Sequence, residues 1–316
     1  MVKHWLNATF SEHSPSNHSP LNHSPLNDWP LNQRPNVFII GAPRSGTSAL
    51  YLSLKQHPQV SLSVLKEPHF LADDLPAQPH TITDWQDYQS LFTGANTAMR
   101  GEGSVWYLSS EHAPRNIHAL NPEAKIIVLL RRPWQQVQSL HSLYLRTGNE
   151  DVTDLEQAIE LAPQRLNGQH LPDQHYFCHG LQYLNNTYYA RMLARYYRYF
   201  TPEQIRVLIF DDYKQDNPKT MAQVCEFLNL SPYSDWAISQ QEGQKRVRSI
   251  VMKQLKQLSP QVRQKIHPKL VQIHKTTAVS DYRPAYLNHL KSLFKTQTQE
   301  LSDLLGRDLY TTWYKD

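Results

Sequence analysis

Residues 37–58, VFIIGAPRSGTSALYLSLKQHP, join four bulky apolar residues to a glycine-flanked turn and then to the start of a helix. The interval from Gly41 to Gly46, followed by Thr47 and Ser48, is that of the loop that binds nucleoside triphosphates, except that Thr47 stands where that loop carries lysine. Such a turn presents backbone N–H groups and the positive end of a helix dipole to an anion. The segment therefore predicts a phosphate site in an α/β fold.

Two omissions separate this loop from a triphosphate site. The lysine that reaches the β- and γ-phosphates is absent, and the strand KIIVLL (125–130) is followed by Arg131-Arg132-Pro133 instead of the aspartate that holds Mg²⁺. Arg44 can supply positive charge at the mouth of the loop. We expect a nucleotide with a short phosphate chain and no metal ion.

Strands of apolar residues without polar alternation indicate a parallel sheet that helices cover on both faces. The pattern predicts strands at 37–40, 60–64, 125–130 and 205–210. It predicts helices at 46–57, 134–146, 181–199 and 217–230, an irregular segment at 66–100, and only helices after about residue 250. The expected fold class is α/β, a central parallel sheet that carries a P-loop and is flanked by helices, with a helical C-terminal portion.

Residues 12–36 repeat a five-residue unit with proline in every copy: EHSPS, NHSPL, NHSPL, NDWPL and NQRPN. Proline removes a backbone donor and favours extended conformations, and the segment has too few apolar residues for a core. We expect a disordered tail at 1–35 that is dispensable for ligand binding, followed by one domain at 36–316.

The composition of the 316-residue chain is that of an ordinary globular protein. Two cysteines cannot build a disulfide framework, no run approaches the roughly 18 apolar residues of a membrane span, and the N-terminus lacks the apolar core of a signal peptide. These features predict a cytoplasmic protein without a membrane span. They leave its oligomeric state open.

The net charge of +4 is unevenly placed, because residues 243–280 hold nine lysines and arginines and no acidic residue. This stretch predicts an anionic contact or, alternatively, a solvated basic helical face. No recognisable nucleic-acid-binding motif accompanies it, so nucleic acid is not an expected partner.

Arg131 at a strand end and Ser139, eight residues later on the next helix, could together bind a second phosphate. Singly, each is ordinary, because an arginine after a strand is usually solvated and a serine inside a helix usually bonds its own backbone. Next to a phosphate loop that lacks lysine, the combination of Arg131 and Ser139 is a more specific indication of a second phosphate site.

Together these motifs resemble the sulfotransferase family that uses 3′-phosphoadenosine 5′-phosphosulfate, and most closely its polysaccharide, heparan-type and bacterial members. The resemblance covers nearly everything after residue 36, in the segments GAPRSGTSALYLSLKQHPQV, KEPHFL, GEGSVWYL, IIVLLRRPWQQVQSLHSLY, FDDYKQDNPKTMAQVCEFLNL and LLGRDL. It implies a donor with one 5′-phosphate and one sulfate, which leaves no γ-phosphate for a lysine to reach.

The resemblance also assigns the donor-binding residues. It implies that the 5′-phosphosulfate binds at Arg44, Ser45, Gly46, Thr47 and Ser48. It implies that the 3′-phosphate, which the product 3′-phosphoadenosine 5′-phosphate retains, binds at Arg131 and Ser139, with Arg246 or Arg248 closing over it.

KEPHFL puts Glu67 where the polysaccharide-acting members carry a glutamate base. A carboxylate can accept the proton of an attacking hydroxyl, and Lys66 would keep it ionised or stabilise charge on the transferring group. His69 would serve as acid, base or orienter, unless it is simply packed beside an aromatic ring. Without the resemblance, a Lys-Glu pair before proline reads as a surface turn.

In GEGSVWYL, many relatives have a lysine after the glutamate, but here Gly103 follows Glu102. Lys66 or Arg44 would then have to supply the missing electrophilic assistance. Glu102 and Ser104 are expected on the substrate side.

The expected reaction is direct in-line transfer of a sulfuryl group to a hydroxyl, or an amine, of a glycan, lipid or small molecule. One alternative is a P-loop kinase-like enzyme that uses a nucleoside triphosphate. Another is a non-catalytic nucleotide- or polyanion-binding protein that uses the basic stretch. The sequence leaves the acceptor open, because acceptor choice rests on loops at 66–100 and 147–180.

Overall fold

The structure is a computed structural model that describes residues 21, 26–94, 97–234, 236 and 282–315. The described residues form two compact units. The sheet unit runs up to Arg131 and resumes from Tyr199 to Trp236, and the helical unit holds Arg132 to Arg198 and the described residues from Tyr282.

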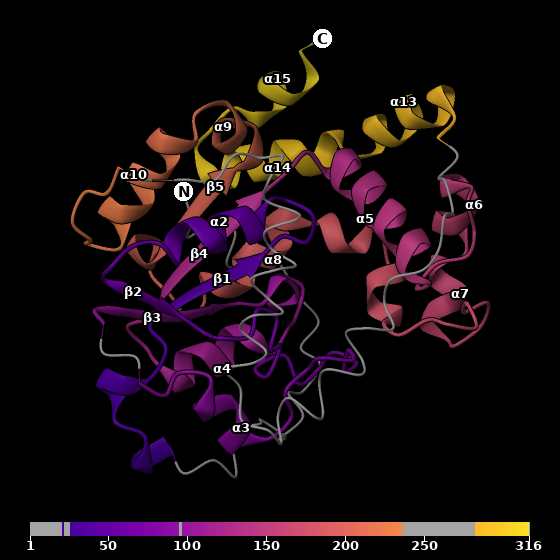
Figure 1. The fold of residues 1–316 in the computed structure, drawn as a ribbon. Helices are drawn as coiled ribbons and strands as arrows, with labels where there is room; N and C mark the ends of the chain where they lie inside the picture. The colour runs from indigo at the N-terminus through magenta and orange to yellow at the C-terminus, as the bar shows by residue number, and fades with distance from the viewer. Residues whose placement is uncertain (1–20, 22–25, 95–96, 235, 237–281, 316) are drawn as a thin grey trace. The chain divides into compact units, whose positions relative to one another are not determined.

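The sheet unit is built on five parallel strands in the order β2-β3-β1-β4-β5 (Figure 1). Their bounds are β1 Val37–Gly41, β2 Val60–Leu62, β3 Met99–Gly103, β4 Lys125–Leu130 and β5 Ile205–Ile209. Val37 pairs with Gly101 of β3 on one side and with Lys125 of β4 on the other, so β1 is central. All five residues of β1 are buried, which is why its sequence is apolar without alternation.

Helices cover both faces of this sheet, with α2 on one face and α4 on the other (Figure 1). The helices of the sheet unit are α2 Thr47–Leu54, α3 Trp85–Ser90, α4 Ala113–Leu120, α9 Phe210–Gln215 and α10 Asn217–Phe227, with 3-10 turns η1 Leu26–Asp28, η2 Leu31–Gln33, η3 Val105–Leu108 and η6 Pro202–Gln204. Leu50 and Leu54 of α2 and Met221 of α10 join Ile39 and Ile127 in one buried cluster. This core fixes the strand ends that carry the loops.

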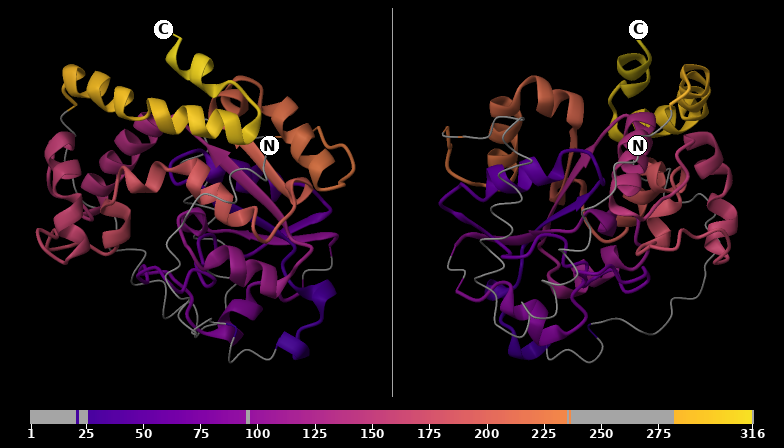
Figure 2. Two further views of the ribbon diagram at one scale, coloured as in Figure 1. Left: turned by 180° about the vertical axis from the view of Figure 1, so that it is seen from behind. Right: turned by 45° about the vertical axis from the view of Figure 1, so that its right-hand side comes forward.

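The helical unit has no strand among its described residues. It contains α5 Pro133–Thr147, α6 Leu155–Glu160, α7 Ala162–Leu166, η4 Cys178–Leu181, η5 Asn185–Thr187, α8 Tyr189–Tyr196, α13 Pro284–Leu293, α14 Lys295–Leu305 and α15 Leu309–Tyr314. Figure 2 shows α13 and α14 following each other in nearly the same direction. A fully buried ion pair joins Arg165 to Glu150 at 2.6 Å, and Tyr183 donates to the same carboxylate at 2.8 Å.

The predicted α/β fold with a parallel sheet is confirmed, and the described C-terminal portion is helical. Two predictions of elements were wrong. The segment 66–100, expected to be irregular, holds α3 and the start of β3, and the Tyr-rich helix expected at 181–199 is confined to α8 after two 3-10 turns. No helix among the described residues is both long and apolar enough to cross a membrane.

Residues 26–35, which fall within the expected tail at 1–35, pack on the sheet unit. Trp29 is 6% exposed, and its ring centroid lies 5.4 Å from that of Trp85 and 6.4 Å from that of Tyr88. The Arg34 side chain donates to the carbonyl oxygen of Leu120 at 3.0 Å. The fourth repeat unit, NDWPL, differs from the earlier ones by a tryptophan with enough apolar surface to anchor the chain. Residues 1–20 and 22–25 lie outside the described residues.

Candidate active site

The glycine-flanked loop lies between β1 and α2, at the carboxyl end of the sheet. Gly46 caps α2 with a left-handed φ of 91°, and a Cβ there would lie 2.9 Å from the Phe210 ring, so both conformation and space require glycine. The Ser45 side chain is fully buried, and its Oγ has no hydrogen-bond partner in the part of the chain that the structure describes. Such a buried hydroxyl can bond a phosphate or sulfate oxygen held at the start of the helix.

Arg131 lies beside this loop because β4 is the neighbour of β1. Its Nη1 donates to the carbonyl oxygen of Arg44 at 3.2 Å, and its guanidinium lies 4.9 Å from the centre of the Phe210 ring. The chain moves to opposite sides of β1 to form β3 and β4, and open α/β sheets bind ligands at the carboxyl ends of strands around such a switch point. The loop and Arg131 are therefore positioned for one ligand.

Ser139 lies on α5, in the helical unit, so its expected pairing with Arg131 stays a prediction. Arg246, Arg248 and the whole basic stretch lie outside the described residues. Their expected role above the 3′-phosphate likewise stays a prediction.

Glu67 lies in the loop after β2, where three neighbours hold it. Oε2 accepts from the backbone N–H of Val105 at 2.7 Å and lies 3.2 Å from Nε2 of His69, while Oε1 pairs with the Lys66 ammonium. Burial raises the pKa of the Glu67 carboxyl, but the Lys66 charge and the His69 hydrogen bond outweigh it and hold the net pKa well below its usual range. Glu67 is thus an ionised carboxylate with 20% of its side chain exposed, as the base hypothesis requires.

His69 contacts Glu67 and also a second histidine. Its ring centroid lies 5.8 Å from that of His80, and burial lowers the pKa of His80 to about 4. Nδ1 of each histidine is buried, and no described residue bonds it. His69 is therefore placed to orient the Glu67 carboxylate, while His80 stays neutral beside it.

Glu102 and Ser104, which were expected on the substrate side, are buried inside the sheet unit. Both are 0% exposed, and the Glu102 carboxylate accepts hydrogen bonds from Ser104 Oγ at 2.6 Å, Tyr88 at 2.7 Å and Tyr107 at 2.8 Å. Burial raises the pKa of Glu102 to about 7, although these three hydroxyls lower it. No face of this carboxylate is left for a substrate.

The glycine that replaces the lysine of many relatives has a local explanation. A Cβ on Gly103 would lie 2.9 Å from the ring of Tyr51, which is 2% exposed and donates to the carbonyl oxygen of Ser63 at 2.5 Å. The Tyr51 ring occupies the space into which a side chain at position 103 would extend. Any electrophilic assistance must therefore come from another position.

Val105 connects the glycine-flanked loop with the candidate base. Its N–H bonds Glu67, and its carbonyl oxygen would lie 2.9 Å from a Cβ on Gly41, the first residue of the loop. Our sequence reasoning missed Val105 as well as Tyr88, Tyr107 and His80. The sequence pointed to Val105 and Tyr107 only through the GEGSVWYL motif, and that motif does not indicate which of its groups face Glu67.

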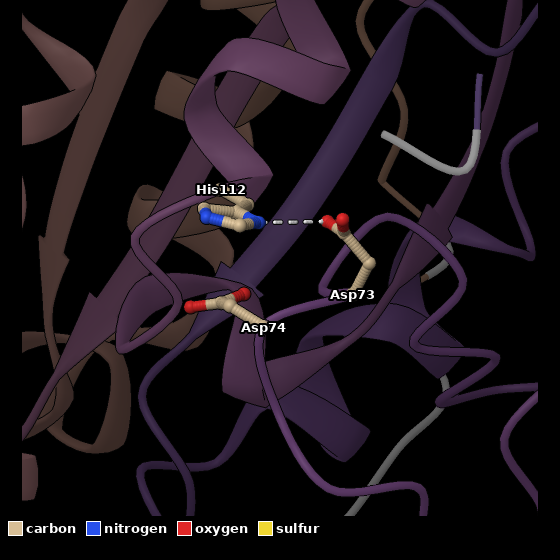
Figure 3. Close-up of side chains that lie close together, drawn as sticks. All are labelled: Asp73, Asp74 and His112. Carbon is tan, nitrogen blue, oxygen red and sulfur yellow. Dashed lines mark ion pairs between the residues drawn. The ribbon is translucent and has the colours of Figure 1, made fainter. Parts of the chain in front are cut away.

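A second cluster of titratable groups, Asp73, Asp74 and His112, lies at the start of α4 (Figure 3). Asp73 pairs with His112 at 3.2 Å and accepts from the Asn116 amide at 2.7 Å. Asp74 accepts from Ser110 Oγ at 2.5 Å and from the backbone N–H of Glu111 at 2.8 Å. These bonds attach the loop after residue 71 to the start of α4. This structural role explains the cluster, and no bound ligand is needed to explain it.

Comparisons with known proteins agree with this geometry. A family model described as "Sulfotransferase domain" matches residues 34–281. Carbohydrate sulfotransferase 15 of Mus musculus is 28% identical over 251 residues, which cover 64% of this chain and 45% of that protein. The bifunctional heparan sulfate N-deacetylase/N-sulfotransferase 3 of Homo sapiens is 26% identical over 219 residues, which cover 64% of this chain and 23% of that protein. The chain thus spans less than half the length of these relatives.

Solved structures with the same architecture include a sulfotransferase from Alicyclobacillus acidocaldarius, with a TM-score of 0.68 and 25% identity over 89% of this chain and 99% of that one. The mouse sulfotransferase SULT7A1, complexed with PAP, has a TM-score of 0.51 and 14% identity over 88% of this chain and 89% of that one. The second likeness is one of fold alone.

Proposed function

The chain belongs to the sulfotransferase domain family, and on this premise we propose that it transfers a sulfuryl group from 3′-phosphoadenosine 5′-phosphosulfate to an acceptor hydroxyl or amine. The observation that carries the proposal is the position of Val105, which bonds the ionised Glu67 through its N–H and borders Gly41 of the phosphate loop through its carbonyl. An anion-binding turn and a carboxylate base thereby flank one residue. Sulfuryl transfer needs both groups close together.

The residues of the loop suit this donor. The buried Ser45 hydroxyl has no hydrogen-bond partner among the described residues, and Arg131 brings a cation to the loop at Arg44. The loop lysine and the magnesium-binding aspartate of triphosphate sites are both missing from their usual positions. These features favour a 5′-phosphosulfate over a nucleoside triphosphate. We assign the 3′-phosphate to Arg131 and Ser139, and include Arg246 or Arg248 as additional contacts.

Glu67 and Lys66 carry the chemistry of the proposal. The acceptor oxygen attacks sulfur and loses its proton to the Glu67 carboxylate, while the bond from sulfur to the 5′-phosphate breaks and 3′-phosphoadenosine 5′-phosphate leaves. Lys66 pairs with Glu67, and from there its ammonium can shift towards negative charge that develops on the leaving phosphate. Nothing in this sequence of steps requires a covalent intermediate or a metal.

We propose a glycan as the acceptor class. The support is that the relatives named above are a carbohydrate sulfotransferase and a heparan sulfate N-sulfotransferase. Lipids and small alcohols are the other candidates. We also retain the cytoplasmic location as a proposal, which fractionation of cells that express the chain would test.

The test is an assay of the purified chain with ³⁵S-labelled donor against glycosaminoglycans, lipids and small alcohols, with and without EDTA. We expect label in an acceptor and no effect of EDTA. Labelled γ-phosphate transferred from ATP with Mg²⁺ would favour the kinase alternative instead. Binding of 3′-phosphoadenosine 5′-phosphate without transfer to any acceptor would favour a non-catalytic nucleotide-binding protein.

A further inference from the structure

We infer that Glu102 is a positioning residue that fixes the turn carrying Glu67, through the hydroxyls of Ser104 and Tyr107. This inference rests on the proposed function, because it assigns a task in that reaction to a residue that cannot contact the substrate. Glu102 is 0% exposed, lies on β3, and bonds only groups of the sheet unit among the described residues.

In the turn at residues 67–71, the backbone N–H of every second residue donates a hydrogen bond to the GEGSVWYL segment. The N–H of Glu67 donates to the Gly103 carbonyl oxygen at 2.9 Å, that of His69 to Ser104 Oγ at 3.0 Å, and that of Leu71 to the Tyr107 hydroxyl oxygen at 3.1 Å. All three acceptors lie within the GEGSVWYL motif. The end of β3 and η3 thus form a template for this turn.

The turn needs a template because its backbone is unfavourable. Glu67 has a φ of 67° and His69 a φ of 53°, in the left-handed region that residues with a Cβ seldom adopt. Such residues persist where surrounding contacts over-determine them, and they cluster at functional sites. Without the bonds to Ser104 and Tyr107, the turn would relax and the Glu67 carboxylate would move from its place beside Val105.

Glu102 orients the two hydroxyl groups that accept hydrogen bonds from the turn, those of Ser104 and Tyr107. The Ser104 hydroxyl donates its only proton to Oε2 of Glu102, so its lone pairs are left for the His69 N–H. The Tyr107 hydroxyl donates to Oε1 in the same way and accepts from the Leu71 N–H. The ionised carboxylate is a pure acceptor, and in this form it orients both hydroxyls as acceptors towards the turn.

Tyr88 provides a matched control for Tyr107. Both phenols are buried and donate to Oε1 of Glu102, at 2.7 Å for Tyr88 and 2.8 Å for Tyr107, but only Tyr107 also accepts from a peptide of the turn. Tyr88→Phe and Tyr107→Phe therefore remove the same group from the same carboxylate. Only the second also releases the turn.

The experiment compares Tyr107→Phe, Ser104→Ala and Glu102→Gln with Tyr88→Phe in the full chain. We expect kcat to fall about ten- to a hundredfold in the first three, because the base is displaced, with the affinity for 3′-phosphoadenosine 5′-phosphate unchanged. Tyr88→Phe should keep kcat within about twofold of the wild type. Amide hydrogen exchange at residues 67–71 should become faster in the first three variants and not in Tyr88→Phe.

Equal kcat losses and equal exchange in Tyr107→Phe and Tyr88→Phe would overturn the inference, since a purely structural role treats the two phenols alike. If the wild type transfers sulfate and none of the variants loses kcat, the positioning role is refuted while the proposed function stands. If the wild type transfers nothing, the proposed function fails, and the exchange comparison alone then decides whether Glu102 orders the turn.

Discussion

The backbone N–H of Val105 donates a 2.7 Å hydrogen bond to Oε2 of Glu67. The candidate base is thus aligned by a backbone N–H at the start of η3, which among substitutions at position 105 only proline would remove. The carbonyl oxygen of the same residue lies against Gly41, the first glycine of the phosphate loop. Val105 therefore contacts both the candidate base and the phosphate loop.

Glu67→Gln should lower turnover about a hundred- to ten-thousandfold, because the amide cannot accept the acceptor's proton. The affinity for 3′-phosphoadenosine 5′-phosphate should hardly change, since binding at the loop does not involve the carboxylate. Steady-state kinetics and calorimetric titration check both values. Glu123→Gln, the same change at an exposed position, is the control. Near-normal turnover in Glu67→Gln would transfer the role of base to another residue, with His69 as the nearest candidate.

Lys66→Met should shift the acid limb of the pH–rate profile to higher pH. Burial alone would raise the pKa of Glu67, and Lys66 is the foremost group that lowers it. A carboxyl with a depressed pKa stays ionised at and below its ordinary pKa, so wild-type activity should persist on acidification, and removing the lysine should shorten that range. Rates from about pH 4 to pH 8 test this, with the exposed Lys219→Met as control. An unmoved acid limb would show that Lys66 does not keep the base ionised.

Arg131→Ala should weaken binding of the 3′,5′-bisphosphate about tenfold or more, relative to adenosine 5′-monophosphate, because a charge-assisted contact is worth roughly 1.5–3 kcal/mol. Arg206→Ala is a close control, since Arg206 also lies over a phenylalanine ring, that of Phe227, but sits within β5. Titration of both nucleotides against both variants gives the discrimination. Equal losses for the two nucleotides in Arg131→Ala would remove the 3′-phosphate assignment.

Glu102 should make the folded protein less stable as the pH rises from about 4.5 to about 7. Its pKa is raised from 4.5 to about 7, so in this window the folded state binds more protons than the unfolded state, and stability falls with rising pH. The full difference corresponds to ~3 kcal/mol. Urea unfolding of the wild type and Glu102→Gln across this range isolates the effect as the difference between the two curves. A difference that is constant with pH would contradict the raised pKa.

Trp29→Ala should destabilise the protein by about 3–5 kcal/mol, the usual cost of removing a buried tryptophan. Leu31→Ala, two residues further on and 48% exposed, should cost less than about 0.5 kcal/mol. Thermal unfolding compares them. Equal effects of the two substitutions would indicate that residues 26–35 do not anchor to the sheet unit, as the tail hypothesis assumed.

The phosphate loop could be predicted from sequence because all its determinants are local. Four apolar residues, a glycine at each end of the turn and a following helix lie within one short segment. β3 could not be predicted, because MRGEG has the composition of a loop. Its Gly101 is required by a neighbour that only the fold supplies, since a Cβ there would lie 2.1 Å from the carbonyl oxygen of Val37.

The candidate site, like the fold, has features that could be predicted from the sequence and features that could not. Glu67 was found through a motif, but its alignment depends on Val105, 38 residues later in the chain. Glu102 was expected on the substrate side because a glutamate next to glycines suggests exposure, whereas the hydroxyls of Ser104 and Tyr107 from its own segment and of Tyr88 from α3 surround it. The contact between Glu67 and Val105 follows from the pairing of the strands, and local patterns do not contain that pairing.

The central place of β1 has a consequence for synthesis on the ribosome. Val37 leaves the exit tunnel first, yet its partners Gly101 and Lys125 are translated long afterwards. Until then the nascent chain displays VFIIG as an apolar strand with two open edges, which favours capture by a chaperone or association with other nascent chains. The phosphate loop can therefore close only after β4 has been made, so a ribosome stalled before residue 125 should hold a chain that cannot bind the nucleotide.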